Sequence, residues 1–362
     1  MSKQHNWIQD WGAPMQLGGC SNCQRVFLSP RTLPEQCPWC HAPAVTAMDA
    51  IEDHPVEVFP PEAWLSHRVD ASNIRAGMER FFADVPFAPT DLNYDNQLQR
   101  LEKLYVPMWW VDAKVDAMWQ AEVGHHYEVK SHKEAYGVAG WHTTELREKR
   151  IAWEWRGGKV EKSFDNTPTP ALTDYNRMLG HLGDFATEGS RPYEASCLDN
   201  AYAVLPDHSV GDAWEEAKYR LDQIARENCL AATEGVQIRE FRWSPEFQHQ
   251  NWTQLLMPVL TTYYLDDEGK RQPIYIHGQT AVVHGNRRAS EKKAVRRSNV
   301  LLLISLLLVV GIVMGALFLS DRQAILPIVI VPGITALILA LVSFDFRTKA
   351  KRFNESEIDG WG

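Results

Sequence analysis

The sequence that decides the fold reads VLLLISLLLVVGIVMGALFL from Val300 to Leu319 and AILPIVIVPGITALILALV from Ala324 to Val342. A helix rises about 1.5 Å per residue, so each run reaches about 30 Å, the thickness of a bilayer's hydrocarbon core. Only residues 320–323 separate the two runs. The pattern predicts a transmembrane helical hairpin over residues 300–343. The alternative, a buried hairpin in a globular core, leaves the basic flanks unexplained.

Basic residues on both flanks predict the orientation of this hairpin. Residues 286–299 form a basic juxtamembrane collar, and a tail at 344–362 follows the second run. The tail carries Arg347, Lys349, Lys351 and Arg352, and the collar carries Arg287, Arg288, Lys292, Lys293, Arg296 and Arg297. Because basic segments stay on the cytoplasmic side, both chain ends are expected in the cytoplasm. The first ten residues have no apolar core of a secretory signal.

Small residues and prolines inside the two runs predict how the helices pack. Gly311 and Gly315 have the GxxxG spacing that lets helices approach closely. Pro327, Pro332 and Gly333 are expected to interrupt the second helix.

Charge divides the chain into two parts. The whole protein has a formal net charge of -9, yet from Asn286 onward 11 Lys and Arg face 6 Asp and Glu, a net of +5. The preceding 285 residues therefore carry a net charge of -14. This split predicts that the six collar residues bind anionic lipid, and it disfavours nucleic acid as a partner.

Two CxxC knuckles are the strongest chemical motif in the chain. Cys20-Ser-Asn-Cys23 is followed, after 13 residues, by Cys37-Pro-Trp-Cys40. Four thiolates in this spacing can converge on one metal ion. The segment Gln24–Gln36 between them is long enough for a β-hairpin.

The knuckles predict a zinc ribbon over residues 1–45. Four protein ligands leave no open position for water, so the Zn2+ is expected to be structural. The alternatives are iron in a rubredoxin-like site and disulfide bonds, which a reducing cytosol disfavours. His41 directly follows the last cysteine, and we expect it to be a bystander.

The chain between the ribbon and the hairpin is expected to be an antiparallel-sheet α+β body. Prolines punctuate a linker at 46–61, a first α+β unit follows at 62–170, and a second occupies 171–285. The expected fold class of the whole protein is therefore α+β.

The first unit shows clear periodicities. Helical spacing covers Ala71–Ala83, and a polar helix is expected at Tyr94–Lys103. Alternation from Trp109 to Trp119 predicts an antiparallel strand with one buried face. Gly157-Gly158 is expected to be the two-residue turn of a further hairpin.

A loop-like stretch is expected from Asn166 to Pro206, across the boundary between the two units. Ser209-Val-Gly-Asp212 then has the form of a helix cap. Strands are expected at 236–243, 255–265 and 274–284. The similarity of Leu104–Trp109 to Leu255–Leu260 suggests either a weak internal duplication or coincidence.

The residues that could carry catalysis do not form a recognisable site. His125, His126, His132 and His142 lie close in sequence without a metal-ligand spacing, and Cys197 and Cys229 lack a partner motif. The chain has no phosphate loop, dinucleotide fingerprint or nucleophile elbow. We therefore expect no enzyme.

The layout resembles a family, the bacterial zinc-ribbon membrane proteins of the YdjG type, with a TFIIB-type or PriA-like ribbon. The resemblance rests on the two knuckles, the terminal hairpin, the strand from Leu104 to Ala113 with its Trp119-Gln-Ala-Glu continuation, Leu256-Met-Pro, and His277-Gly-Gln-Thr280. It implies residence in the bacterial inner membrane and a role beside SPFH (flotillin or stomatin-like) or phage-shock-type proteins in membrane stress.

Two functional classes remain in competition at this stage. One is a membrane-anchored scaffold that binds a protein partner through the ribbon or through sheet edges marked by Pro107 and Pro258. The other is a nucleic-acid-associated factor that uses the ribbon. The acidic body favours the scaffold. A zinc hydrolase would need an open metal position, which four cysteine ligands do not leave.

Overall fold

The computed structural model describes residues 7–30, 32–48, 59–137, 140–175, 180–232, 237–318 and 322–359. It is a mixed α+β protein with a large sheet, a four-cysteine cluster near the N-terminus and two apolar helices near the C-terminus, which confirms these parts of the expected fold class. The chain divides into two compact units. Unit 1 comprises Met1–Val106, Asp174–Leu205 and Leu256–Gly362, and unit 2 comprises Pro107–Thr173 and Pro206–Leu255.

Short antiparallel strands build the N-terminal part of unit 1. The 3-10 helix η1 (Trp7–Trp11) precedes β1 (Gln16–Cys20), β2 (Val26–Ser29) and β3 (Val45–Ala47). β1 pairs with both β2 and β3, and β2 pairs with β8 (Ala201–Val204). The cysteine-containing segment is therefore continuous with the sheet of unit 1.

The expected hairpin within Gln24–Gln36 is wrong. Its strand β2 pairs instead with β1, which lies before the first knuckle, so the hairpin encloses that knuckle. Burial explains the choice, because Leu17 and Leu28 face each other in the register and both are buried. β3 extends into the expected linker, since Ala47 pairs with Gly18.

The middle part of unit 1 contains α1, α2 and several short elements. Its elements are β4 (Ala63–Trp64), α1 (Ala71–Ala83), α2 (Tyr94–Gln99), η2 (Thr187–Gly189), β7 (Arg191–Pro192), η3 (Ala195–Leu198), β10 (Arg271–His277) and β11 (Val283–Gly285). α1 has the predicted bounds, and the Asp70 side chain caps it by accepting from the Asn73 amide. Its buried Ile74 and Met78 pack with Ile276 in the core. α2 ends four residues before the predicted Lys103.

Two strands pass from one unit to the other. β5 (Glu102–Gly137) and β9 (Gln237–Leu265) are neighbours in the strand order β11-β10-β9-β5-β8-β2-β1-β3. Pro107 and Pro258 lie on these interior strands and are buried, so the expectation that they mark open sheet edges is wrong. The Pro258 carbonyl accepts a hydrogen bond from Gly278 at 2.9 Å.

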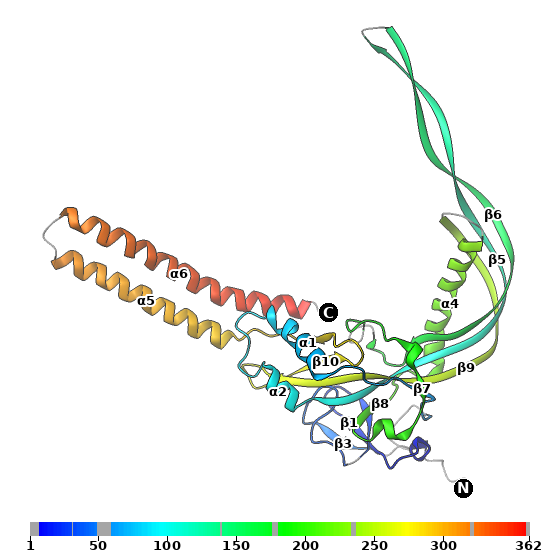
Figure 1. Cartoon of the computed structure of the whole chain (residues 1–362), viewed down its shortest axis with the longest axis horizontal. Coiled ribbons are helices and arrows are strands. Elements are labelled where there is room, and N and C mark those ends of the chain that lie inside the picture. The colour runs from blue at the N-terminus through cyan, green and yellow to red at the C-terminus, as the bar shows by residue number, and fades with distance from the viewer. Residues whose placement is uncertain are drawn as a thin grey trace. The chain divides into compact units, whose positions relative to one another are not determined.

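Unit 2 consists of long strands covered by one helix. β6 (Gly140–Pro170) pairs with β5 from Met108 to Gly137, and the two wind around each other as a twisted ribbon (Figure 1). α4 (Val210–Ala232) begins after Ser209, whose hydroxyl accepts from the Asp212 amide at 3.2 Å as the helix cap predicts. Val115, Phe164 and Leu221 form the core beneath the helix.

The strands of unit 2 are longer than the sequence-based interpretation predicted. Gly157 and Gly158 are not a turn but lie within β6, opposite Gln120 and Trp119. β6 continues to Pro170, into the stretch expected as a loop, and β9 is one strand where two were expected. In each case cross-strand pairing with β5 or β10 overrides the local breaker signal.

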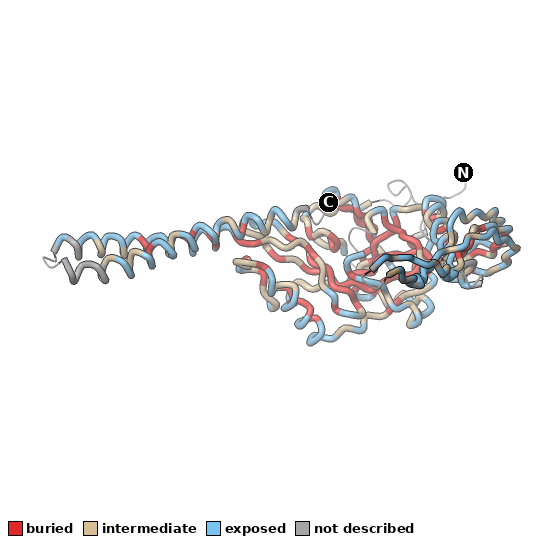
Figure 2. The backbone as a smooth tube through the Cα atoms, turned by 90° about the horizontal axis from the view of Figure 1, so that it is seen from above, coloured by how far each residue is buried: buried red, intermediate tan, exposed pale blue. Residues whose placement is uncertain are grey.

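Helices α5 (Glu291–Phe318) and α6 (Arg322–Asp359) run side by side as a hairpin (Figure 1). Both are long and apolar enough to cross a membrane, and only 11% of each apolar window is buried. Exposed positions predominate along the hairpin (Figure 2). A core helix of a globular domain would be mostly buried, so the buried-hairpin alternative is contradicted.

Small and hydroxyl side chains hold the two helices together. The Ser298 and Ser343 hydroxyls lie 2.7 Å apart, and the Ser305 hydroxyl donates to the Ala336 carbonyl at 2.8 Å. A Cβ added at Gly311 would meet nothing within 4 Å, so α6 does not approach α5 closely at this glycine of the GxxxG motif. α6 is continuous through both prolines, which corrects the expected interruption.

The tail is a helical extension that packs on unit 1. α6 continues to Asp359, and its Phe346 ring lies 5.1 Å from that of Phe87. The Asn354 side chain accepts from the Ala289 amide at 2.8 Å. The hairpin is therefore fixed to the body of unit 1 by both of its basic flanks.

Candidate metal centre

The four knuckle cysteines converge in unit 1. Their Sγ atoms all lie within 4.8 Å of one another, and the Cys20–Cys40 and Cys23–Cys37 pairs are each separated by 3.7 Å. In a regular tetrahedron with metal–sulfur bonds of about 2.3 Å, sulfurs lie about 3.8 Å apart. The two 3.7 Å pairs match this spacing, and the cluster as a whole is compact enough to hold one tetrahedral ion.

The two knuckles share one backbone conformation. Gln24 donates to the Cys20 carbonyl and His41 donates to the Cys37 carbonyl, both at 2.8 Å. Each of these donors has a positive φ, 58° for Gln24 and 57° for His41. In each knuckle the first cysteine amide then donates at 2.9 Å to the carbonyl five residues on. Two matching turns present two thiols each, which explains why a pair of CxxC motifs is enough to define the site.

Hydrogen-bond donors reach two of the four sulfurs, and the thiols influence one another's protonation. The Trp39 amide donates to Cys37 Sγ at 3.4 Å, and Asn22 Nδ2 donates to Cys40 Sγ at 3.6 Å. The hydrogen bond with Cys23 raises the pKa of the Cys37 thiol far above its ordinary value, whereas hydrogen bonds from Cys23 and Cys37 lower the pKa of Cys40 to about 2. Four thiolates this close repel one another, so full deprotonation requires a cation at the centre.

The second knuckle is anchored to the sheet of unit 1. His41 is buried, and its Nε2 lies 2.8 Å from the Thr261 hydroxyl on β9. Burial lowers the pKa of His41 to about 4, so the ring is neutral at pH 7. The Tyr275 hydroxyl on β10 donates to the Trp39 carbonyl at 3.0 Å. His41 is thus not grouped with the cysteines, and it acts as a contact between the knuckle and the sheet.

The other candidate residues do not gather into a site within the described parts of the chain. His125 lies 3.0 Å from Glu154 on the β5–β6 ribbon, and His126 and His132 are exposed there. The side chains of His142 and Cys229 lie outside the described residues. Burial raises the pKa of the Cys197 thiol to about 12, so this thiol is protonated and poorly nucleophilic.

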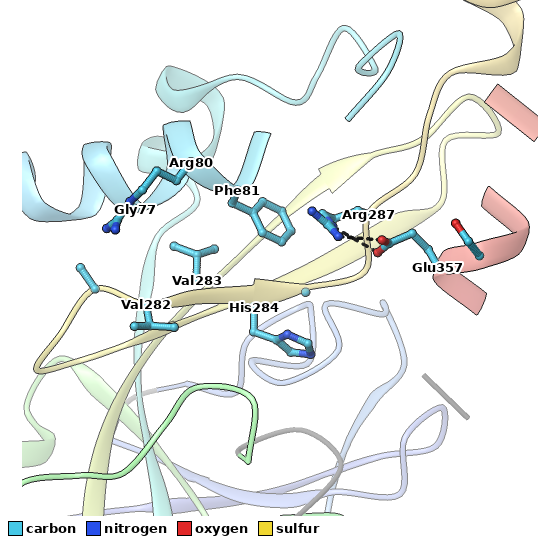
Figure 3. A pocket seen from close by; sticks show the side chains of 11 residues that line it. Gly77, Arg80, Phe81, Val282, Val283, His284, Arg287 and Glu357 are labelled. Atoms are coloured by element: carbon cyan, nitrogen blue, oxygen red, sulfur yellow. Dashed lines mark hydrogen bonds and ion pairs between the residues drawn. The ribbon is translucent and has the colours of Figure 1, made fainter. Parts of the chain in front are cut away.

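Part of the basic collar is engaged inside the protein. A cavity of about 490 Å³ lies between α1, β11 and the end of α6, and Figure 3 shows Arg287 beside it in contact with Glu357. Arg287 donates to both Glu357 oxygens, at 2.7 and 3.2 Å. The Lys293 ammonium donates to the Ala88 carbonyl at 2.7 Å, and the Lys292 ammonium donates to the Asp267 carbonyl. Sequence reasoning missed these partners because all are distant along the chain.

Comparisons with known proteins give no relative. No family model, no curated protein and no solved structure matches the chain.

Proposed function

We propose that the protein is a membrane-anchored cytosolic scaffold or adaptor with a structural zinc ribbon. The observation that carries the proposal is the β5–β6 ribbon of unit 2, which extends beyond the α4-covered core and ends in exposed aromatic side chains. Apolar spans hold the chain at a membrane, and the ribbon offers an uncovered surface to a partner.

The far end of the ribbon is built as a contact surface. Tyr136 and Trp141 are a cross-strand pair, 74% and 73% exposed, with ring centroids 5.4 Å apart. Tyrosine and tryptophan dominate the binding energy of protein interfaces. A two-stranded ribbon is only marginally stable in water by itself. A partner that covers the ribbon from Tyr127 to Arg150 supplies the packing that this segment lacks.

Zinc is the metal that the donor set favours. Four thiolates in tetrahedral geometry suit Zn2+ or iron, and a closed four-cysteine site built on two knuckles is typical of structural zinc. The ion links the first and second knuckles and, through Trp39 and His41, supports the sheet of unit 1. Elemental analysis of the purified protein tests this assignment, with one zinc per chain expected and iron as the contrary result.

The proposed location is the bacterial inner membrane, with two spans and both chain ends in the cytoplasm. The basic flanks of the hairpin support this orientation. Reporter fusions at the two chain ends and at Asp321 test this orientation, because the scaffold proposal requires the chain ends in the cytoplasm and Asp321 on the opposite side of the membrane.

Resemblance to the YdjG type supplies the partner class, an SPFH protein or a phage-shock-type protein. Photocrosslinking in native membranes tests the docking surface: a photoreactive residue at Trp141 should capture a protein partner, whereas one at Tyr219, an aromatic on α4 that is 65% exposed, should not. Replacing Tyr136 and Trp141 by serine should lower partner recovery at least tenfold. Recovery of nucleic acid in place of protein contradicts the scaffold and favours the nucleic-acid role.

A further inference from the structure

The residues of the basic collar have different surroundings, and one of them is placed to bind a lipid. Arg287, Lys292 and Lys293 donate to protein oxygens. The Arg297 guanidinium lies over the Phe87 ring, 5.7 Å from its centroid. Arg296 is exposed and, among the residues that the structure describes, makes no hydrogen bond or ion pair.

Arg296 also stands between two shallow apolar depressions on α5. One is lined by Val295, Val300 and Leu303, and the other lies toward α6 and is lined by Leu301 and Phe346. Val300 lines both depressions and begins the uncharged run. An exposed cation one turn before a membrane span, with apolar side chains on both sides of it, can hold a phosphate while the first carbons of two acyl chains lie against Val300, Leu301 and Leu303.

We propose that Arg296 binds the phosphate of one anionic phospholipid, whose acyl chains lie in the two depressions. The inference deepens the proposed membrane anchoring and rests on α5 being a span. A guanidinium donates two parallel hydrogen bonds to a phosphate, and the hydrocarbon on either side fixes the headgroup against it. The negative charge of the headgroup matches the unpaired cation. Lys292 lines one of the depressions and Lys293 and Arg297 line the other, so they add positive charge around the headgroup.

Native mass spectrometry of the delipidated full-length protein tests the site. The probes are phosphatidylglycerol and phosphatidylcholine with identical chains. The intact protein should retain one phosphatidylglycerol and discriminate against phosphatidylcholine. Arg296→Gln should lower phosphatidylglycerol occupancy about tenfold, the scale of a lost charge-assisted hydrogen bond. Arg296→Lys keeps the charge without the fork and should cause a smaller loss.

The matched control is Lys349→Gln. Lys349 is exposed on α6, carries the same charge, and lines neither depression. Equal losses for Arg296→Gln and Lys349→Gln would show a diffuse charge effect and overturn the proposal. So would equal retention of both lipids, or displacement of the lipid by millimolar glycerol 3-phosphate, which would indicate a site for free phosphate. Carbonate extraction tests separately whether the protein is anchored in the membrane. If the protein resists extraction but shows no preference between the two lipids, the lipid site is refuted and the membrane anchoring is not.

Discussion

Replacing Cys37 by serine is predicted to destabilise unit 1 as a whole, beyond the knuckle itself. From the sequence alone, the ribbon is a separate module that would unfold locally while the membrane hairpin stays inserted. In the structure, however, the second knuckle packs against the sheet of unit 1. Trp39 is only 2% exposed, its carbonyl accepts a hydrogen bond from the Tyr275 hydroxyl on β10, and its ring lies 5.1 Å from the Tyr275 ring. Loss of the metal releases Trp39 together with the His41–Thr261 contact.

The size of the effect follows from these contacts. A buried tryptophan removes about 200 Å² from water, which stabilises by about 5 kcal/mol at 25 cal/mol per Å². Each lost hydrogen bond adds about 1 kcal/mol. Because the knuckle keeps part of its packing, we expect a loss of about 4 kcal/mol, equivalent to a thousandfold change in an opening equilibrium.

Hydrogen exchange is the direct assay, because it reads the opening of β10 separately from that of the knuckle. The zinc content and the amide protection of Arg271–His277 should fall together in Cys37→Ser. Cys197→Ser, a part-buried cysteine outside the cluster, is the control and should retain both. If Cys37→Ser loses zinc while β10 keeps its protection, the ribbon is an independent module and the reasoning is refuted.

Three further perturbations test other parts of the fold. Burial lowers the pKa of His67 to about 4, below the unfolded value of about 6.5, so its neutral form contributes stability that is complete above pH 6.5 and is lost as the pH falls toward 4, by about 3 kcal/mol. His67→Gln should flatten that part of a denaturation-versus-pH profile, and an unchanged slope contradicts the assignment. Arg287→Gln leaves Glu357 part-buried without its cation and should cost about 2 kcal/mol; a thermal shift no larger than that of the exposed Arg352→Gln refutes the role of this ion pair. Gly77→Ala favours the helix by about 1 kcal/mol, yet its methyl would overlap a carbonyl of the loop before β11, so net destabilisation by urea titration is expected and net stabilisation would be contrary.

Local signals in the sequence predicted the parts of the fold that depend on near neighbours. α1 has its predicted bounds because Asp70, Ile74 and Met78 supply a cap and an apolar stripe within one helix. The metal centre was predictable for the same reason, since each CxxC spacing closes its own turn. The residues that hold the second knuckle to the sheet were not predictable, because Thr261 and Tyr275 lie more than 200 residues away from it in the sequence.

Long strands were predicted poorly because pairing decides their length. Gly157 and Gly158 carry a turn signal, but Trp119 lies against Gly158, with ring atoms 3.2 to 3.6 Å from where a Cβ would be. The absence of a side chain at Gly158 leaves room for the indole next to the strand. A glycine pair that resembles a turn in the sequence thus provides space for a side chain of the neighbouring strand. This role could not be predicted without the register of the two strands.

The basic collar shows that the role of a charged residue also depends on partners distant in the sequence. Six basic residues before a span predict attraction to an anionic membrane, yet Arg287, Lys292 and Lys293 find partners 70, 25 and 205 residues away. An internal partner removes much of a cation's attraction for lipid, because its hydrogen bonds are already made and its charge is partly neutralised. Charge counting therefore overstates the electrostatic part of membrane binding and understates how firmly unit 1 holds its hairpin. The proposed lipid contact at Arg296 accordingly rests on the exposure of that side chain and on the apolar residues beside it, and not on the number of basic residues.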